Sequence, residues 1–218
     1  MKVLYKDFNQ EAFSFQNDPV LVLEEFWTPE DTAFFRNAMK QAKWKKLLDL
    51  PAVSRAFPNA GNWLKGDVEQ NERETFFGKI NLPCIENHID SFPNIKQRHL
   101  NLNYYSYGVG DCLPTHDDTD EAYVPSNLPR PPLRRLAMVA YFHEEWQPDW
   151  GGELIVYGER KDTSDKKALD IVGCVAPKPR SLAMFTVPRH HRVCRIDPLA
   201  GDHRRQTIVT WFMTEHFG

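Results

Sequence analysis

The stretch YGVGDCLPTHDD, residues 107–118, decides how the rest of the chain is interpreted. It places His116 and Asp118 two residues apart at the end of a strand-like run. In an extended strand, residues two apart lie on the same face, so both side chains point one way while Asp117 points away. An imidazole and a carboxylate on one face suit a metal such as Fe(II), and a second histidine would complete a facial triad.

The H-x-[DE] pattern is weak by itself, because 8 histidines and 30 acids in 218 residues give about one occurrence by chance. Two further matches occur, at His88 and His143. His88 falls in a predicted short helix, where residues two apart do not face each other. His143 ends an apolar strand before a charged turn, and we interpret it as an ordinary strand-end histidine. The match at His116 is therefore the best candidate for a metal site among the three.

Residues 97–214 have the texture of strands separated by glycine, proline and charge clusters. Eight such runs in about 120 residues indicate an antiparallel sandwich or barrel and argue against alternating β-α units. The runs are RHLNLNYYSYG (98–108), DCLPTHDD (111–118), RRLAMVAYF (134–142), GGELIVY (151–157), DIVGCVA (170–176), SLAMFTVP (181–188), HRVCRI (191–196) and RQTIVTWF (205–212).

The N-terminal part, about residues 1–96, is predicted to be a helical support region for that core. Residues 20–26 read as a buried strand, and Thr28-Pro29-Glu30-Asp31 supplies an N-cap, a first-turn proline and an acid at N3 for a helix to about Trp44. Residues 50–75 are expected to be irregular and to cover one end of the domain. A second short helix is expected around residues 83–92. The length fits a single domain, 1–218, better than two.

Composition excludes several classes of protein. A formal charge of -3 gives no basic field for general nucleic-acid binding. The longest uncharged runs reach about half of the ~20 residues that a membrane helix needs. The N-terminus does not resemble a secretory signal, and four cysteines without a C-x-x-C pair indicate neither a zinc knuckle nor a disulfide framework. We therefore expect a cytoplasmic protein whose cysteines are mostly buried.

Two connections, residues 119–132 and 159–169, are long and polar or proline-rich. Loops of this length are either lids or passive surface connections. The segment 119–135 leaves directly from Asp118, so a substrate-selecting lid is one hypothesis for it and a solvated connection is the other.

Residues 107–118 resemble the Y-x-x-G-x-x-x-x-x-H-x-D segment of the prolyl 4-hydroxylase-like Fe(II)/2-oxoglutarate dioxygenases. Further segments follow in that family's order. Residues 136–154 are similar to its strand, tryptophan turn and Gly-Gly-Glu-Leu strand, and residues 191–193 to its H-x-V. Residues 205–212 are similar to its R-x-S-x-x-x-W-F strand, with Thr207 in place of serine. The interval from His191 to Arg205 is longer than usual for the family, because residues 196–203 extend the turn.

The resemblance implies a mainly β fold, a double-stranded β-helix (jelly roll, cupin-like) with N-terminal helices packed on the outside. It implies His116, Asp118 and His191 as ligands of Fe(II), with 2-oxoglutarate and O2 as cosubstrates and ascorbate as a candidate reductant. Oxygen would decarboxylate 2-oxoglutarate to succinate and CO2 while a substrate C-H bond is hydroxylated.

The resemblance also implies a binding site for the distal carboxylate of 2-oxoglutarate. Arg205 is the main candidate, because a buried carboxylate needs a partner and the planar guanidinium offers two parallel charge-assisted bonds. Alternation from Trp211 favours Arg205 over its neighbour Arg204. Thr207 and Tyr141 are candidate further donors, and the alternative for Tyr141 is a core aromatic residue whose hydroxyl is satisfied by the backbone. Tyr107 either lines the pocket or is structural.

Several functions remain open at this point. A prolyl residue of a protein or peptide is the default substrate, with a free amino acid or other small metabolite as the alternative. A non-catalytic jelly-roll binding module is the alternative from another class, and a metal-dependent cupin without a 2-oxo acid would leave Arg205 without a task. The carboxylate of Asp118 argues against the halogenase variant of this chemistry, which needs that ligand position for chloride. Neither a nucleic acid nor a membrane is an expected partner.

Overall fold

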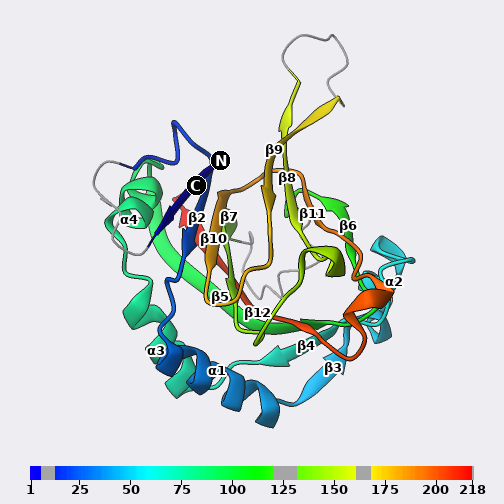
Figure 1. Ribbon diagram of the computed structural model, residues 1–218. Helices are drawn as coiled ribbons and strands as arrows, with labels where there is room; N and C mark the ends of the chain where they lie inside the picture. Colours follow the sequence, from blue (N-terminus) through cyan, green and yellow to red (C-terminus); the bar gives the residue numbers. More distant parts are fainter. Residues whose placement is uncertain (6–12, 120–131, 161–167, 218) are drawn as a thin grey trace.

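The computed structural model covers residues 1–218 and describes residues 1–5, 13–119, 132–160 and 168–217. Two β-sheets form its core, and the helices of residues 29–41, 70–79 and 83–90 lie on the outside of the larger sheet (Figure 1). This confirms the predicted jelly roll with external N-terminal helices. In spatial order the larger sheet contains β1 (Lys2–Tyr5), β2 (Val20–Glu24), β10 (Leu182–Thr186), β7 (Leu133–Tyr141), β12 (Arg205–His216), β5 (Ile95–Tyr107), β4 (Leu64–Asp67) and β3 (Trp44–Lys46).

The smaller sheet lies against the larger one and carries part of the candidate site. Its strands, in spatial order, are β6 (Leu113–His116), β11 (His191–Val193), β8 (Leu154–Glu159) and β9 (Leu169–Val175). The helices are α1 (Pro29–Gln41), α2 (Pro51–Ala56), α3 (Gln70–Lys79) and α4 (Pro83–Asp90). Within the described ranges, no helix combines the length and the apolar character needed to cross a membrane.

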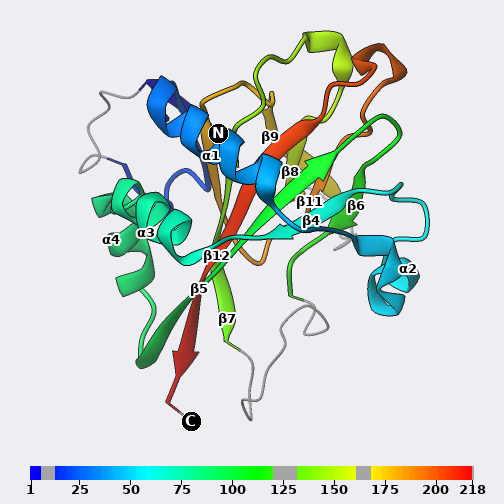
Figure 2. The same cartoon turned by 90° about the horizontal axis from the view of Figure 1, so that it is seen from below.

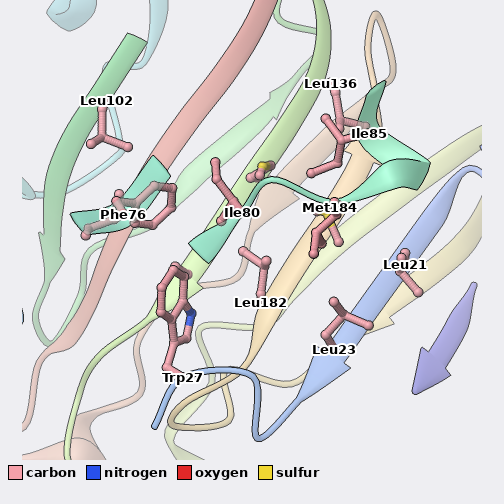
Figure 3. Close-up of a cluster of buried hydrophobic side chains, with 14 of the residues drawn as sticks. Leu21, Leu23, Trp27, Phe76, Ile80, Ile85, Leu102, Leu136, Leu182 and Met184 are labelled. Carbon is pink, nitrogen blue, oxygen red and sulfur yellow. The ribbon is translucent and has the colours of Figure 1, made fainter. Parts of the chain in front are cut away.

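Strand β7 shows why the central strands read as continuous apolar runs. Its residues point alternately to the two faces of the large sheet, and both faces are covered. Leu136 and Met138 belong to the hydrophobic cluster under the helices. Figure 3 shows Leu136 in this cluster together with Trp27 and Phe76. Residues 137, 139 and 141 instead pack against residues 154, 156 and 175 of the small sheet. The central strands are therefore buried on both sides.

The helix predicted after residue 28 is confirmed as α1, although it ends at Gln41 rather than near residue 44. The Thr28 hydroxyl accepts a hydrogen bond from the Asp31 N–H at 3.1 Å, and the Asp31 carboxylate accepts one from the Thr28 N–H at 3.1 Å. This capping box satisfies two backbone donors that the helix itself leaves unpaired. The predicted helix near residues 83–92 is confirmed as α4.

The prediction of an irregular segment over residues 50–75 is wrong. That range contains α2, β4 and the start of α3. Strand β4 pairs with β5 and β3 pairs with β4, so the N-terminal part extends the large sheet and is not purely helical. Figure 2 shows α2 at the far end of this sheet from α3 and α4, beside β4 and β6. The local composition of this segment is loop-like, and pairing with the long strand β5 overrides it.

The structure tests the expectation for the cysteines but not the one for the long connections. All four cysteines are free thiols, but only Cys84 is buried and Cys174 is exposed, so the expectation that they are mostly buried is wrong. The interiors of the two long connections, residues 120–131 and 161–167, lie outside the described residues. The lid hypothesis for residues 119–135 therefore stays a prediction.

Candidate active site

His116 and His191 lie side by side on neighbouring strands of the small sheet. β11 pairs with β6, and the two histidines are direct partners in this register. Their ring centroids are 4.1 Å apart. The chain order thus separates the two residues by a long stretch of sequence, while the sheet brings them into contact.

Asp118 joins the two histidines, but for a different reason from the one predicted. β6 ends at His116, and the backbone at Asp118 is left-handed, with a φ of 64°. Aspartate is one of the residues that tolerates this conformation. The strand alternation assumed from the sequence therefore does not apply, and a turn carries the carboxylate back to the histidines. One ligand atom from each of the three residues lies within 4.8 Å of the others.

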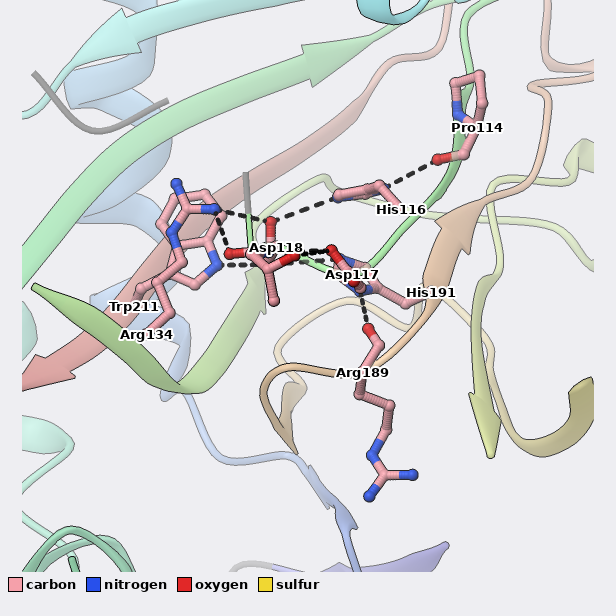
Figure 4. Close-up of polar contacts among 9 residues, drawn as sticks. Pro114, His116, Asp117, Asp118, Arg134, Arg189, His191 and Trp211 are labelled. Carbon is pink, nitrogen blue, oxygen red and sulfur yellow. Dashed lines mark hydrogen bonds and ion pairs between the residues drawn. The ribbon is translucent and has the colours of Figure 1, made fainter. Parts of the chain in front are cut away.

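The hydrogen bonds of the two imidazoles define which ring nitrogen is free. His116 Nδ1 donates to the Pro114 carbonyl at 2.9 Å, and His191 Nδ1 donates to the Arg189 carbonyl at 2.8 Å (Figure 4). Because a carbonyl only accepts, each neutral ring carries its proton on Nδ1 and presents the lone pair of Nε2. Both Nε2 atoms face the Asp118 carboxylate, each at 3.5 Å.

The protonation states of Asp118 and His191 suit a cation. Burial acts to raise the pKa of the Asp118 carboxyl, but its interactions with His116, His191 and Arg134 outweigh burial and hold that pKa well below its usual range. Burial, together with the nearby His116, lowers the pKa of His191 to about 4. At neutral pH, lone pairs of His191 and of a carboxylate therefore face each other. Such a group is favourable when a metal ion lies between its members.

Two residues outside the predicted set hold the Asp118 carboxylate. Arg134 Nη1 donates to its Oδ1 at 3.0 Å and to its backbone carbonyl at 3.1 Å, and Trp211 Nε1 donates to Oδ2 at 2.7 Å (Figure 4). The Arg134 guanidinium also stacks on the Trp211 ring, 4.5 Å from its centroid. Strand alternation from Arg205 already places Trp211 on the inner face. No local pattern marks Arg134.

A cavity of ≈ 480 Å³ lies at this centre. His116, Asp118 and His191 line it from the small sheet and the turn after β6, while Arg205 lines it from β12 of the large sheet. Most of the other lining side chains are apolar or aromatic, which is typical of small-molecule sites. They include Leu47, Leu50, Val53, Phe57, Trp63, Tyr105, Tyr107, Val139, Leu154, Phe185 and Val209.

Arg205 is 1% exposed, and within the described residues it forms no ion pair with a carboxylate. Its Nη2 donates to the Tyr141 hydroxyl at 3.3 Å, while its Nε has no partner among the described atoms. A buried guanidinium without an anion is costly, so this residue is suited to receive a carboxylate from a ligand.

The other three residues predicted around the cosubstrate differ in their contacts. The Tyr141 hydroxyl reaches Arg205, which fits a role as a second donor better than a bond to the backbone. The Thr207 hydroxyl is buried and has no partner among the described atoms. Tyr107 lines the cavity, and its ring stacks on that of Trp63 with 5.1 Å between the centroids. It therefore has both of the roles considered for it, as a pocket-lining residue and as a structural one. Burial raises the pKa of Tyr107 and Tyr141, which keeps both as neutral hydroxyl donors.

The residues that the sequence analysis did not assign to the site lie outside this centre. Arg204 directly precedes β12 and does not line the cavity, and its Nε donates to the Ser106 hydroxyl at 2.7 Å. The neighbour of His191, His190, is exposed. His88 Nε2 contacts the Arg135 carbonyl at 3.2 Å, and His143 Nε2 contacts the Pro177 carbonyl at 2.6 Å.

Comparisons with known proteins agree with this geometry. The structure is similar to a prolyl-4-hydroxylase from Pseudomonas putida (TM-score 0.58, 13% identity, 92% of this chain and 95% of that chain). It is also similar to a viral collagen prolyl hydroxylase from Paramecium bursaria Chlorella virus-1 (TM-score 0.58, 14% identity, 92% of this chain and 98% of that chain). A third similar structure is a Trichoplax adhaerens prolyl hydroxylase in complex with a hypoxia inducible factor oxygen degradation domain peptide fragment (TM-score 0.61, 15% identity, 91% of this chain and 85% of that chain).

At these identities the structural likeness establishes the fold. A sequence comparison with curated proteins finds no match. The family model described as the 2OG-Fe(II) oxygenase superfamily matches residues 102–213, just over half of the 218 residues. That match spans His116, Asp118, His191 and Arg205, and the chain therefore belongs to the 2OG-Fe(II) oxygenase superfamily.

Proposed function

We propose that this protein hydroxylates an unactivated C-H bond, and that a prolyl residue of a peptide or protein is the first substrate class to test. The observation that carries the proposal is the convergence of Nε2 of His116, Nε2 of His191 and the Asp118 carboxylate in one cavity with the Arg205 guanidinium, which is buried and has no carboxylate partner among the described residues. Prolyl hydroxylases among the structural neighbours support the choice of substrate class.

The residues present fit the two groups that the family uses. The two imidazoles and Asp118 would hold Fe(II), because their lone pairs face one another with Nδ1 already bonded to backbone. Arg205 would pair with the distal carboxylate of 2-oxoglutarate, and the Tyr141 and Thr207 hydroxyls are placed to add hydrogen bonds. When bound, Fe(II) and 2-oxoglutarate supply the oxygen activation and the electrons for hydroxylation.

The remaining groups of the site position and shield the reaction. Arg134 and Trp211 hold both oxygens of the Asp118 carboxylate and so set its orientation. A substrate seated against the apolar and aromatic walls would displace water from the reacting groups, which would limit side reactions. Retention of the Asp118 carboxylate favours hydroxylation over halogenation.

The proposal is tested by incubating the protein with Fe(II), 2-oxoglutarate, ascorbate and O2. Proline-containing peptides and free amino acids are supplied as separate panels. We expect succinate formation matched by a product that has gained one oxygen atom, and neither from the Asp118→Ala variant. A non-catalytic binding module would form no succinate with any panel. Hydroxylation of free amino acids with no reaction on peptides would replace the prolyl-peptide substrate by the small-metabolite alternative.

Trp211→Phe is expected to weaken Fe(II) binding by about ten-fold, because loss of a hydrogen bond to a metal ligand typically costs 10–100-fold in affinity. The change removes the indole N–H that reaches Asp118 at 2.7 Å and alters no charge. Anaerobic Fe(II) titration measures the effect. Trp44→Phe is the matched control, since it removes an indole bond to the Met39 carbonyl away from the site. Equal affinities in the two variants would contradict a positioning role for Trp211.

A further inference from the structure

The positive and negative charges of the side chains that line the cavity are unequal in number. Lys65, Arg134 and Arg205 are cationic, whereas Asp118 is the one acidic residue among the described lining residues. Arg134 is paired with Asp118 at 3.0 Å. Arg205 would be matched by the distal carboxylate of 2-oxoglutarate, whose other end would face the metal. Lys65 then remains without an assigned anion.

Strand register places Lys65 inside the site. Lys65 of β4 is the direct partner of Tyr105 on β5, and Tyr105 is in turn the partner of Thr207 on β12. Side chains at paired positions share a face of the sheet, so Lys65 lies on the cavity side in the same row as Tyr105. Both residues line the cavity.

The immediate neighbours of Lys65 do not neutralise it. Asp67 acts on it electrostatically, but the Asp67 carboxylate forms its ion pair with Lys45, at 3.2 Å. In the described part of the chain, the Lys65 ammonium forms no hydrogen bond or ion pair. Burial lowers the pKa of Lys65, which is the expected cost of an ammonium group held in partly apolar surroundings.

Lys65 lies nearer the cavity entrance than Arg205. Arg205 and Tyr107 are buried, whereas Lys65 is partly exposed and Leu50, which also lines the cavity, is 52% exposed. Four further apolar side chains line the same cavity, those of Leu47, Pro51, Val53 and Phe57. A ligand that enters after 2-oxoglutarate would therefore meet an apolar surface with one unmatched cation at its edge.

We propose that the substrate carries a carboxylate that pairs with Lys65 while its apolar part lies against the wall formed by Leu47, Pro51, Val53 and Phe57. This inference rests on the proposed function, since it names a property of that enzyme's substrate. The carboxylate can come from a free amino or organic acid, or from an acidic residue or C-terminus of a peptide. Lys65 is thus a specificity-determining residue on a strand that lies outside the family match.

The test uses a carboxylate probe and its neutral counterpart, cyclohexanecarboxylate and cyclohexanecarboxamide. Their binding to the anaerobic Fe(II) protein saturated with 2-oxoglutarate is measured by calorimetry. We expect the carboxylate to bind about ten-fold more tightly than the amide, as one charge-assisted pair allows. The preference should disappear in Lys65→Met and survive in Lys65→Arg. It should also survive in the control Lys178→Met, whose exposed ammonium is paired with Glu24 and does not line the cavity.

Equal binding of the two probes by the unaltered protein, or an unchanged preference in Lys65→Met, would overturn the proposal. Loss of 2-oxoglutarate affinity in Lys65→Met as large as in Arg205→Ala would also overturn it, since Lys65 would then serve the cosubstrate. Thermal melting of Lys65→Met and Lys65→Arg tests whether both variants are folded. The preference for the carboxylate probe is measured by binding and does not depend on turnover. If the protein formed no succinate, the proposed function would be refuted, while the binding preference could still be determined.

The source of the carboxylate is separated by paired substrates. Free proline is compared with prolinamide, and peptides with aspartate beside the proline are compared with the asparagine peptides, by 2-oxoglutarate consumption. Discrimination within the first pair assigns a small acid, and discrimination within the second assigns a peptide. Equal turnover within both pairs for a hydroxylated substrate would contradict the pairing with Lys65.

Discussion

Asp118→Ala is expected to weaken Fe(II) binding by at least ~100-fold, because even loss of a group that only supports a ligand costs 10–100-fold. The variant removes the carboxylate that, within the described residues, faces both Nε2 atoms. It also leaves Arg134 as a buried cation without its partner. Anaerobic titration of the purified apoprotein with Fe(II) measures the loss.

Two controls test this assignment beside the site. Asp117→Ala removes the adjacent carboxylate, which accepts a hydrogen bond from the Thr119 N–H and does not join the cluster. His190→Ala removes the exposed neighbour of His191. Both should bind Fe(II) as the unaltered protein does. Unchanged affinity in Asp118→Ala, or an equal loss in the controls, would show that the metal is held elsewhere.

Arg205→Ala is expected to raise the dissociation constant for 2-oxoglutarate by two orders of magnitude or more. Removing one partner of a buried charge pair costs roughly 3–5 kcal/mol, and each ~1.4 kcal/mol corresponds to a factor of ten. Arg205 is buried beside the Tyr141 hydroxyl and has no carboxylate of its own among the described residues. Calorimetric titration of the metal-loaded, oxygen-free protein with 2-oxoglutarate reports this change directly.

Arg204→Ala is the matched control for that experiment. Arg204 contacts the hydroxyl and the carbonyl of Ser106 on the outer face of the strand, so its loss should leave the affinity for 2-oxoglutarate unchanged. It can lower thermal stability, because two hydrogen bonds disappear. If the two variants lost affinity equally, the inner and outer faces of β12 would be assigned the wrong way round.

Much of the core was predictable from local pattern. The central strands are buried on both faces, so their apolar runs stand out in the sequence, as in β7. The capping box of α1 is likewise a local signal, because every group it needs lies within residues 28–31. Alternation along β12 was enough to place Arg205 and Trp211 on the inner face and Arg204 on the outer one.

Residues 50–75 could not be predicted in this way. β4 has the sequence LKGD, which contains neither β-branched nor aromatic side chains, and its extended form depends on pairing with β5. This strand carries Lys65, so the most distinctive feature of the cavity comes from the segment with the weakest local signal.

The sequence by itself determined the residue types of the site and the jelly-roll fold, because spacing, alternation and the family pattern are all properties of contiguous residues. Only the tertiary structure decided how the site is assembled. It brings His191 opposite His116 across a sheet, turns Asp118 back through a left-handed residue, and supplies Arg134 and Lys65 from other strands. These contacts depend on strand pairing between distant segments, and no local pattern records which distant partner a side chain will meet.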